Sequence, residues 1–259
     1  MRVTTLGDLI LDVIVRLDGP LVAGDDSVAE TRAGAGGQAA NVAAWAAALG
    51  SDARFVGKRG DDAAGIVVAR ELTSRGVDVS GPAGGRNGVV VSIAAGGDRT
   101  MASDRGVASE LRREELEAAW FECDVLHVSG YALAREPIAS AARRAVELAR
   151  AAGARVSVDL SAWTLVDDLF RSRVRALQCD TIFANERERD AVGEIEAEWV
   201  VKRGAEGVVF AGDALPSLAS DVVDTTGAGD ALAAGHLVGG IERGLEAAAC
   251  CCAQLGAMP

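Results

Sequence analysis

The sequence predicts an α/β fold with a mostly parallel central sheet flanked by helices and a small second sheet beside it. Short runs rich in valine and isoleucine alternate with alanine-rich helical patterns along most of the 259 residues. Repeated strand–helix units of this kind build parallel sheets covered on both faces. Hydrophobic residues make up 49% of the chain and charged residues 25%, as in ordinary globular domains. We therefore expect a single domain over residues 1–259.

The expected strands and helices form five pairs in chain order. These are VTTLG and NVAAWAAAL, ARFVG and GIVVARELTSR, DVLHVSG and PIASAARRAVELARAAG, ARVSVDL and SRVRALQ, and DTIFAN and ERERDAV. In a parallel sheet all the strands end at the same edge, and ligands bind there. Polar residues that follow the strands are therefore the first candidates for a functional site.

Two segments break this alternation and predict the small second sheet. Apolar residues and glycine-containing turns mark lid strands within about residues 12–24 and 87–103. A sheet of this kind has one face to bury. We expect it to cover a pocket as a lid or to pair with a second copy in a homodimer.

Composition excludes several kinds of partner. The net charge of −12 opposes binding to nucleic acid or to an anionic membrane. No run of about 18 apolar residues is present and the first residues do not resemble a secretion signal, so a cytoplasmic location is expected. The five cysteines lack any CxxC spacing and are expected to be packed thiols.

The segment DTTGAGD, residues 224–230, is the strongest candidate for chemistry. Gly227, Ala228 and Gly229 leave the backbone bare at an expected helix start, where N–H groups can bind a phosphate. Asp230 would repel that phosphate, which makes sense if its carboxylate accepts a proton from an attacking hydroxyl. The alternative is a glycine-rich turn in which Asp230 is an ordinary residue of the first helical turn.

Two segments together resemble a known family. DTTGAGD resembles the carboxyl-terminal signature of the ribokinase, or PfkB, family of carbohydrate and nucleoside kinases, and residues 36–60 resemble its amino-terminal signature. GDLILDV, GDDAAG and NERE resemble further motifs of that family in the expected order. The resemblance covers nearly the whole chain and implies a ribokinase-like three-layer sandwich with a small β-sheet lid.

The resemblance also implies a role for each matching residue. Asp230 would be the general base, and the N–H groups of Gly227, Ala228 and Gly229 would stabilise the transferred phosphoryl group. Residues expected to bind substrate are Asp12, Gly36, Gly37 and Asn41. Residues expected beside ATP are Asn185, Glu188, Lys202, Gly204, Gly207 and Gly229, with Glu188 positioning Mg²⁺ through water. Asp224 and Thr226 match positions that bind a monovalent cation such as K⁺ in many members.

Other interpretations remain open from the sequence. Arg105 follows the second lid segment, where it could bind an acidic or phosphorylated substrate or form a salt bridge at the rim. The leading function is an ATP-dependent sugar kinase, and the alternatives are a nucleoside kinase or a catalytically weak sugar- or nucleotide-binding sensor. A dinucleotide oxidoreductase is disfavoured because no GxGxxG follows the first strand. The segment between Asn185 and Lys202 is short for the family, so one helix beside the nucleotide is expected to be missing.

Overall fold

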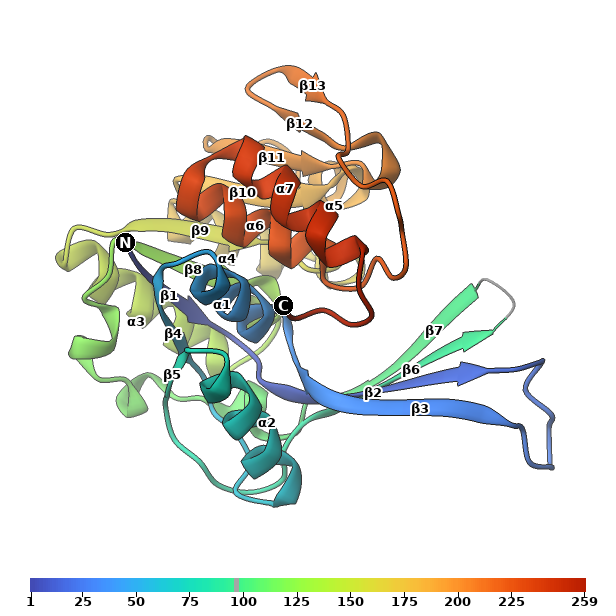
Figure 1. Ribbon diagram of the computed structural model, residues 1–259. Coiled ribbons are helices and arrows are strands. Elements are labelled where there is room, and N and C mark those ends of the chain that lie inside the picture. The colour runs from blue at the N-terminus through green and yellow to red at the C-terminus, as the bar shows by residue number, and fades with distance from the viewer. Residues whose placement is uncertain (96–97) are drawn as a thin grey trace.

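The computed structural model describes residues 1–95 and 98–259, and its body is a nine-stranded sheet between two layers of helices (Figure 1). The strand order is β13-β12-β11-β10-β9-β8-β1-β4-β5. The strands are β1 (Arg2–Leu6), β4 (Asp52–Val56), β5 (Asp78–Ser80), β8 (Val125–Ser129), β9 (Arg155–Asp159), β10 (Thr181–Asn185), β11 (Glu198–Lys202), β12 (Val208–Phe210) and β13 (Asp213–Leu215). From β11 to β5 neighbouring strands are parallel, and β12 and β13 add an antiparallel edge.

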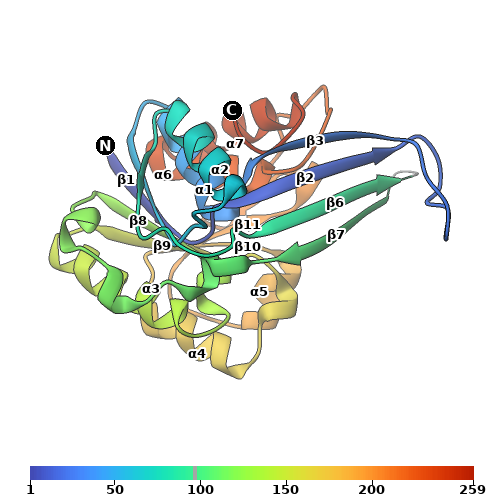
Figure 2. The same cartoon turned by 90° about the horizontal axis from the view of Figure 1, so that it is seen from below.

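Helices cover both faces of the sheet, as Figure 2 shows from below. One layer contains α1 (Gln38–Ala48), α2 (Ala63–Ser74), α6 (Ala228–Gly239) and α7 (Ile241–Cys252). The other contains α3 (Ile138–Ala151), α4 (Asp168–Leu177) and α5 (Glu186–Val192). Short 3₁₀ helices occupy connections: Gly106–Glu110, Arg113–Glu115, Ala118–Phe121, Gly130–Leu133, Trp163–Leu165 and Gly204–Glu206.

Alanine content explains how closely the helices pack. In α1 and α6 most buried side chains are alanines, so their small methyl groups let the two helices approach each other and the sheet. The central strands are apolar runs because both of their faces are covered, and β8 is buried along its whole length. All five predicted strand–helix pairs are present, and no helix lies between α5 and β11, as the short segment predicted.

The second sheet is a four-stranded lid with the order β3-β2-β6-β7, and it projects from the body (Figure 1). Its strands are β2 (Ile10–Leu17), β3 (Ala29–Gly36), β6 (Val89–Ala95) and β7 (Asp98–Asp104). Strands β6 and β7 lie in the segment expected at residues 87–103, of which residues 96–97 lie outside the described part. In the segment expected at residues 12–24, β2 ends at Leu17, and its antiparallel partner is β3.

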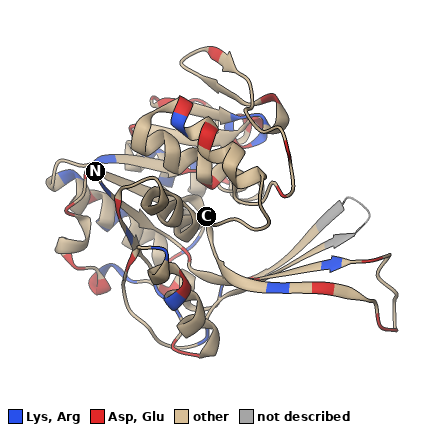
Figure 3. Ribbon diagram, viewed as in Figure 1, with Lys and Arg blue, Asp and Glu red and all other residues tan. Residues whose placement is uncertain are grey.

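Charged residues are spread over the helices of both layers (Figure 3). Among the described residues, no helix combines the length and the apolar composition that crossing a membrane requires. The five cysteines are free thiols, and Cys250 is the exposed one.

Candidate active site

The predicted substrate residues line one cavity of about 180 Å³ under the lid. Asp12 reaches it from β2, Gly37 and Asn41 from the start of α1, Arg105 from the end of β7, and Asp230 from the first turn of α6. Gly36 lies beside this cavity instead of on its surface. A Cβ atom there would lie 2.1 Å from Asp12 Oδ2, so only glycine leaves room for the Asp12 carboxylate. We call this space the acceptor cavity.

Asp230 lies where α6 begins. Gly227 precedes the helix with φ of 78°, a left-handed conformation that suits glycine, and a Cβ atom there would lie 2.6 Å from Ala257. The first i→i−4 hydrogen bond of the helix runs from Ala231 N to Gly227 O over 2.9 Å. The N–H groups of residues 227–229 precede that bond, although Ala228 N also donates to Thr225 O over 3.3 Å. The segment therefore presents backbone donors beside Asp230.

The surroundings of Asp230 favour proton uptake near neutral pH. Burial and the negative charges of Asp159 and Asp8 together raise the pKa of Asp230 to about 7, against the opposing effects of Asn41 and Lys202. Asn41 Nδ2 donates a hydrogen bond of 2.7 Å to Asp230 Oδ2. This bond fixes the carboxyl group, so Asn41 supports the proposed base in addition to lining the acceptor cavity.

A buried ion pair lies behind the backbone donors. Lys202 Nζ, at the end of β11, is 2.6 Å from Asp159 Oδ2, at the end of β9, and the Asp159 side chain is fully buried. Burial alone would lower the pKa of Lys202, but the charges of Asp159 and Glu188 raise it above its ordinary value, so the amine carries a charge. A Cβ atom on Gly229 would lie 3.4 Å from Lys202 Nζ. The amine is therefore held directly beside the glycine segment.

The predicted nucleotide residues line a second cavity of about 490 Å³ on the other side of the start of α6. Residues predicted for this role line it, namely Asn185, Lys202, Gly204, Gly207 and Gly229, and Ser217 and Thr225 add hydroxyl groups. Val208, Leu232 and Leu245 line it as apolar residues. A cavity that combines a polar and an apolar surface suits a nucleotide, with its phosphates toward Lys202 and its base among the apolar side chains.

Glu188 is buried behind this cavity. Its Oε2 accepts a hydrogen bond from Asn185 N, and its Oε1 accepts one from Asn185 Nδ2, both of 2.8 Å. Asn185 Oδ1 in turn accepts a bond from Glu188 N, so the two residues form a capping box at the start of α5. Burial raises the pKa of Glu188. The predicted pair is therefore in contact, with Asn185 on the cavity surface and Glu188 fixing it.

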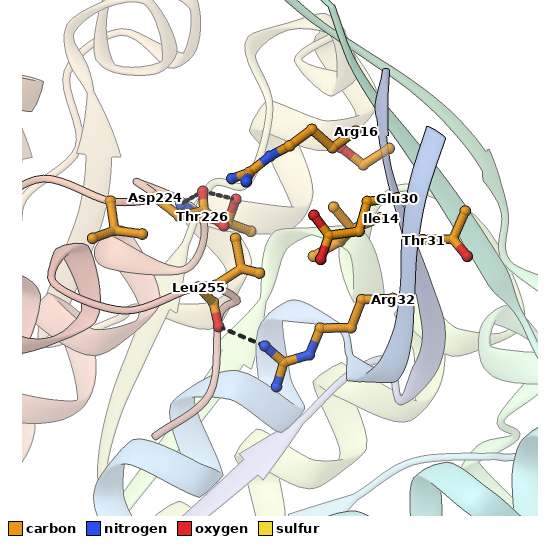
Figure 4. Close-up of a pocket in the computed structure, with 10 residues that line it drawn as sticks. Ile14, Arg16, Glu30, Thr31, Arg32, Asp224, Thr226 and Leu255 are labelled. Atoms are coloured by element: carbon orange, nitrogen blue, oxygen red, sulfur yellow. Dashed lines mark hydrogen bonds between the residues drawn. The ribbon is translucent and has the colours of Figure 1, made fainter. Parts of the chain in front are cut away.

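Asp224 and Thr226 lie in a third cavity of about 190 Å³ (Figure 4). Asp224 Oδ1 accepts hydrogen bonds from Thr226 N and Oγ1, of 2.9 and 2.6 Å, and Asp224 Oδ2 accepts one from Gly256 N of 3.1 Å. Arg16 on β2 extends toward this loop, and Arg32 on β3 donates to Leu255 O over 3.4 Å (Figure 4). These hydrogen bonds to Asp224 stabilise the loop that precedes α6. Among the described residues, no three His, Cys, Asp or Glu side chains form a metal-binding group.

The structure adds residues to the candidate site that the sequence did not single out. Asp8 is buried, forms an ion pair with Arg105 and lines the acceptor cavity. Arg105 also stacks on Tyr131, with its guanidinium carbon 3.7 Å from the ring centroid. Arg105 therefore forms a salt bridge with a buried aspartate and also lines the predicted substrate site. One feature of the sequence could have identified Asp159 as a candidate, because it is a polar residue at the end of an apolar run. It belongs to none of the motifs that resemble the family.

Comparison with known proteins identifies the family of the chain. The model of the pfkB family of carbohydrate kinases matches residues 2–257. An ATP-dependent ribose-1-phosphate kinase from Halopiger xanaduensis is 34% identical over 97% of this chain and 90% of its own length. Fructokinase-1 from Oryza sativa is 34% identical over 88% of this chain and 80% of its own length.

Solved structures share the same fold. An adenosine kinase from Sinorhizobium meliloti is 28% identical with a TM-score of 0.82, over 99% of this chain and 95% of that one. A putative ribokinase II from Escherichia coli, in complex with ATP and Mg²⁺, has a TM-score of 0.85 over 99% of this chain and 94% of that one. At 20% identity, this second likeness shows the fold.

Proposed function

The chain belongs to the pfkB family of carbohydrate kinases and is a phosphotransferase, and we propose that it transfers the γ-phosphoryl group of ATP directly to a hydroxyl of a sugar or sugar-like molecule. The observation that carries this proposal is the meeting of two cavities at the start of α6. Asp230 lines one, Gly229 and Lys202 line the other, and both contain residues of the 227–230 segment. An acceptor and a nucleotide bound there would have their reacting groups on either side of the glycine segment.

Asp230 is the proposed general base. Asn41 donates to its Oδ2 atom, and no hydrogen bond to Oδ1 is found among the described residues, so Oδ1 can accept the proton of an acceptor hydroxyl. The N–H groups of residues 227–229 and the charged Lys202 amine would stabilise the negative charge on the transferred group. Asp12 would fix another hydroxyl of the acceptor by accepting its hydrogen bond. The reaction then needs no phospho-enzyme, because acceptor and nucleotide are both bound at the same segment.

The residues of the larger cavity fit a nucleotide with Mg²⁺. Gly207 has φ of 91°, and a Cβ atom there would lie 2.1 Å from Leu215 O, so this turn keeps its backbone close to the cavity. Mg²⁺ neutralises phosphate charge when it is bound, and Glu188 would position it through water. Asp224 and Thr226 are the proposed ligands of a monovalent cation such as K⁺, which would stiffen the loop before α6.

A coupled ADP-release assay tests the proposed function. Magnesium-ATP is combined with pentoses, hexoses, sugar phosphates and nucleosides, and we expect turnover with one class of acceptor. Turnover on a nucleoside alone would favour a nucleoside kinase. The likeness to an adenosine kinase is the reason for testing this alternative. ATP binding without turnover on any acceptor would contradict the proposal and favour a sensor.

The lid is the proposed contact of a homodimer. Asp12, Ile14 and Ser92 line the acceptor cavity, so their neighbours along β2 and β6 point to the opposite face of the lid. Those neighbours include Val13, Val15, Val91 and Ile93, which form an apolar surface suited to a second copy of the chain. A cytoplasmic location also stays a prediction of the sequence, and cell fractionation would test it.

A further inference from the structure

A side cavity of about 290 Å³ adjoins the acceptor cavity. The two share Asp8, Arg105 and Tyr131 in their linings. Asp230 and Gly227 line only the acceptor cavity, whereas Arg135 lines only the side cavity. A molecule whose reacting hydroxyl lies at Asp230 would therefore extend its far end toward Arg105 and Arg135.

Positive charge exceeds negative charge in this side cavity. Its charged lining residues are Arg105, Arg135 and Asp8. Asp8 forms an ion pair with Arg105, which leaves Arg135 as uncompensated charge in a chain whose net charge is −12. Among the ion pairs found in the described residues, none includes Arg135. The neighbouring Glu136 has other partners, since it pairs with Arg173 at 2.9 Å and accepts hydrogen bonds from Ser140.

Arg105 is held in place before any ligand binds. One of its Nη atoms donates to Asp8, its guanidinium carbon lies over the ring of Tyr131, and its side chain is 20% exposed. A guanidinium has five donors, so others stay available to a ligand. Because Arg105 covers one face of Tyr131, that face cannot stack on a nucleobase. Ser109 and Thr164 add hydroxyl groups to the same lining.

We propose that the side cavity is an anion subsite, and that the acceptor of this kinase is a sugar carrying a phosphate or carboxylate group which Arg105 and Arg135 bind. This inference rests on the proposed kinase function and adds the class of acceptor. Guanidinium groups bind phosphate and carboxylate through paired hydrogen bonds, and the partly buried Arg105 strengthens the interaction. Arg135 is the residue that determines this specificity, because its charge is not used elsewhere in the described structure.

The kinetic test compares neutral and anionic acceptors. Ribose is paired with ribose 1-phosphate and ribose 5-phosphate, fructose with its 1- and 6-phosphates, and glucose with gluconate. We expect kcat/KM to be at least about tenfold higher for one anionic acceptor than for its neutral partner. Comparison of the sugar phosphates with gluconate shows whether the subsite prefers a phosphate or a carboxylate group. A neutral sugar that matches or exceeds every anionic partner would overturn the inference.

Variants of two arginines locate the effect. Arg135→Met should raise the KM for the anionic acceptor by about tenfold while kcat changes less than about twofold, since Arg135 lies away from the reacting atoms. The control is Arg144→Met, because Arg144 pairs with Glu147 on the exposed surface of α3 and should leave both constants unchanged. An unchanged KM in Arg135→Met would also overturn the inference.

Calorimetry without ATP separates this inference from the proposed kinase function. Each sugar phosphate and gluconate is titrated into the wild-type protein and into Arg135→Met. If an anionic sugar binds and needs Arg135 but no acceptor yields ADP, the anion subsite stands and the kinase proposal fails. If a neutral sugar is phosphorylated and no anionic sugar binds, the kinase stands and the anion subsite is wrong.

Discussion

Asp230 is surrounded by charges that set the pH at which it can accept a proton. Burial and then the charges of Asp159 and Asp8 disfavour its ionisation, whereas the Asn41 hydrogen bond and Lys202 favour it. With a pKa of about 7, Asp230 gains and loses its proton close to neutral pH. The Asp159–Lys202 pair therefore positions the amine beside Gly229 and also adjusts the proposed base.

This balance predicts opposite pH shifts in two variants. In the wild-type protein kcat/KM should rise with pH through about 7, since Asp230 must lose its proton to act as a base. Asp159→Asn removes a negative charge and frees Lys202, so the pKa of Asp230 falls and the rise moves to lower pH. Lys202→Met removes a positive charge, so the rise moves to higher pH. Profiles of kcat/KM from about pH 5 to 9 measure this, and shifts in the same direction would contradict it.

Site residues that belong to sequence motifs were predictable, whereas residues that reach the site through contacts in space were less predictable. The sequence predicted Asp12, Asn41 and Asp230, and the structure places them around one cavity. It did not single out Asp8 and Asp159, because their contacts with Arg105 and Lys202 join residues 97 and 43 positions apart. Motif spacing along the chain does not predict such contacts, because they depend on the order of strands in the sheet.

At the scale of single elements, helix α6 brings the proposed base and the backbone donors together. Two glycines in this helix allow its two ends to be tested separately. A Cβ atom on Gly229 would lie 3.3 Å from the flexible Lys202 stem, and one on Gly239 would lie 3.2 Å from the Arg243 stem. Both methyl groups can be accommodated by moving a side chain, so neither substitution should unfold the protein.

Gly229→Ala should lower kcat by about tenfold or more, because its methyl group displaces Lys202 and obstructs access to the backbone N–H groups of residues 227–229. Gly239→Ala at the far end of α6 serves as the matched control and should keep near wild-type activity. Thermal unfolding should give Tm values within a few degrees of the wild type for both. Equal activity in both variants, with folding intact, would argue against a role for the segment in phosphoryl transfer.

Lid strand β3 shows why one element escaped prediction. Its sequence AETRAGAG has few β-branched residues and no apolar alternation, so intrinsic preference does not predict a strand. It is a strand because it pairs with β2 in a continuous register from Ile10↔Gly36 to Leu17↔Ala29. The register also places Gly36 beside the first residues of β2, where the Asp12 carboxylate needs space.

At the scale of the whole molecule, the lid separates two surfaces with different roles. One face lines the acceptor cavity, and the other carries the apolar side chains of Val13, Val15, Val91 and Ile93. The body was predictable because burial of both faces gives each strand an apolar run between helices. Lid assembly was less predictable, because β2, β3, β6 and β7 come from separated parts of the chain.

The apolar lid face predicts a homodimer in solution. Sedimentation should give about twice the chain mass of 26.5 kDa. Val91→Asp should shift the protein to the monomer, since it would bury an unpaired charge between the two lids. Leu169→Asp, which changes an exposed apolar residue on α4, should not change the mass. A wild-type monomer at micromolar concentration would rule out this contact.

The most direct measurement compares Asp230→Asn with the wild-type protein on the best acceptor. The amide keeps the size of the side chain but cannot accept the hydroxyl proton at neutral pH, so kcat should fall by at least about a hundredfold. Binding of ATP and acceptor should persist, and Asp221→Asn on the exposed loop before α6 should remain active. A kcat within about threefold of the wild type would show that Asp230 is not the base.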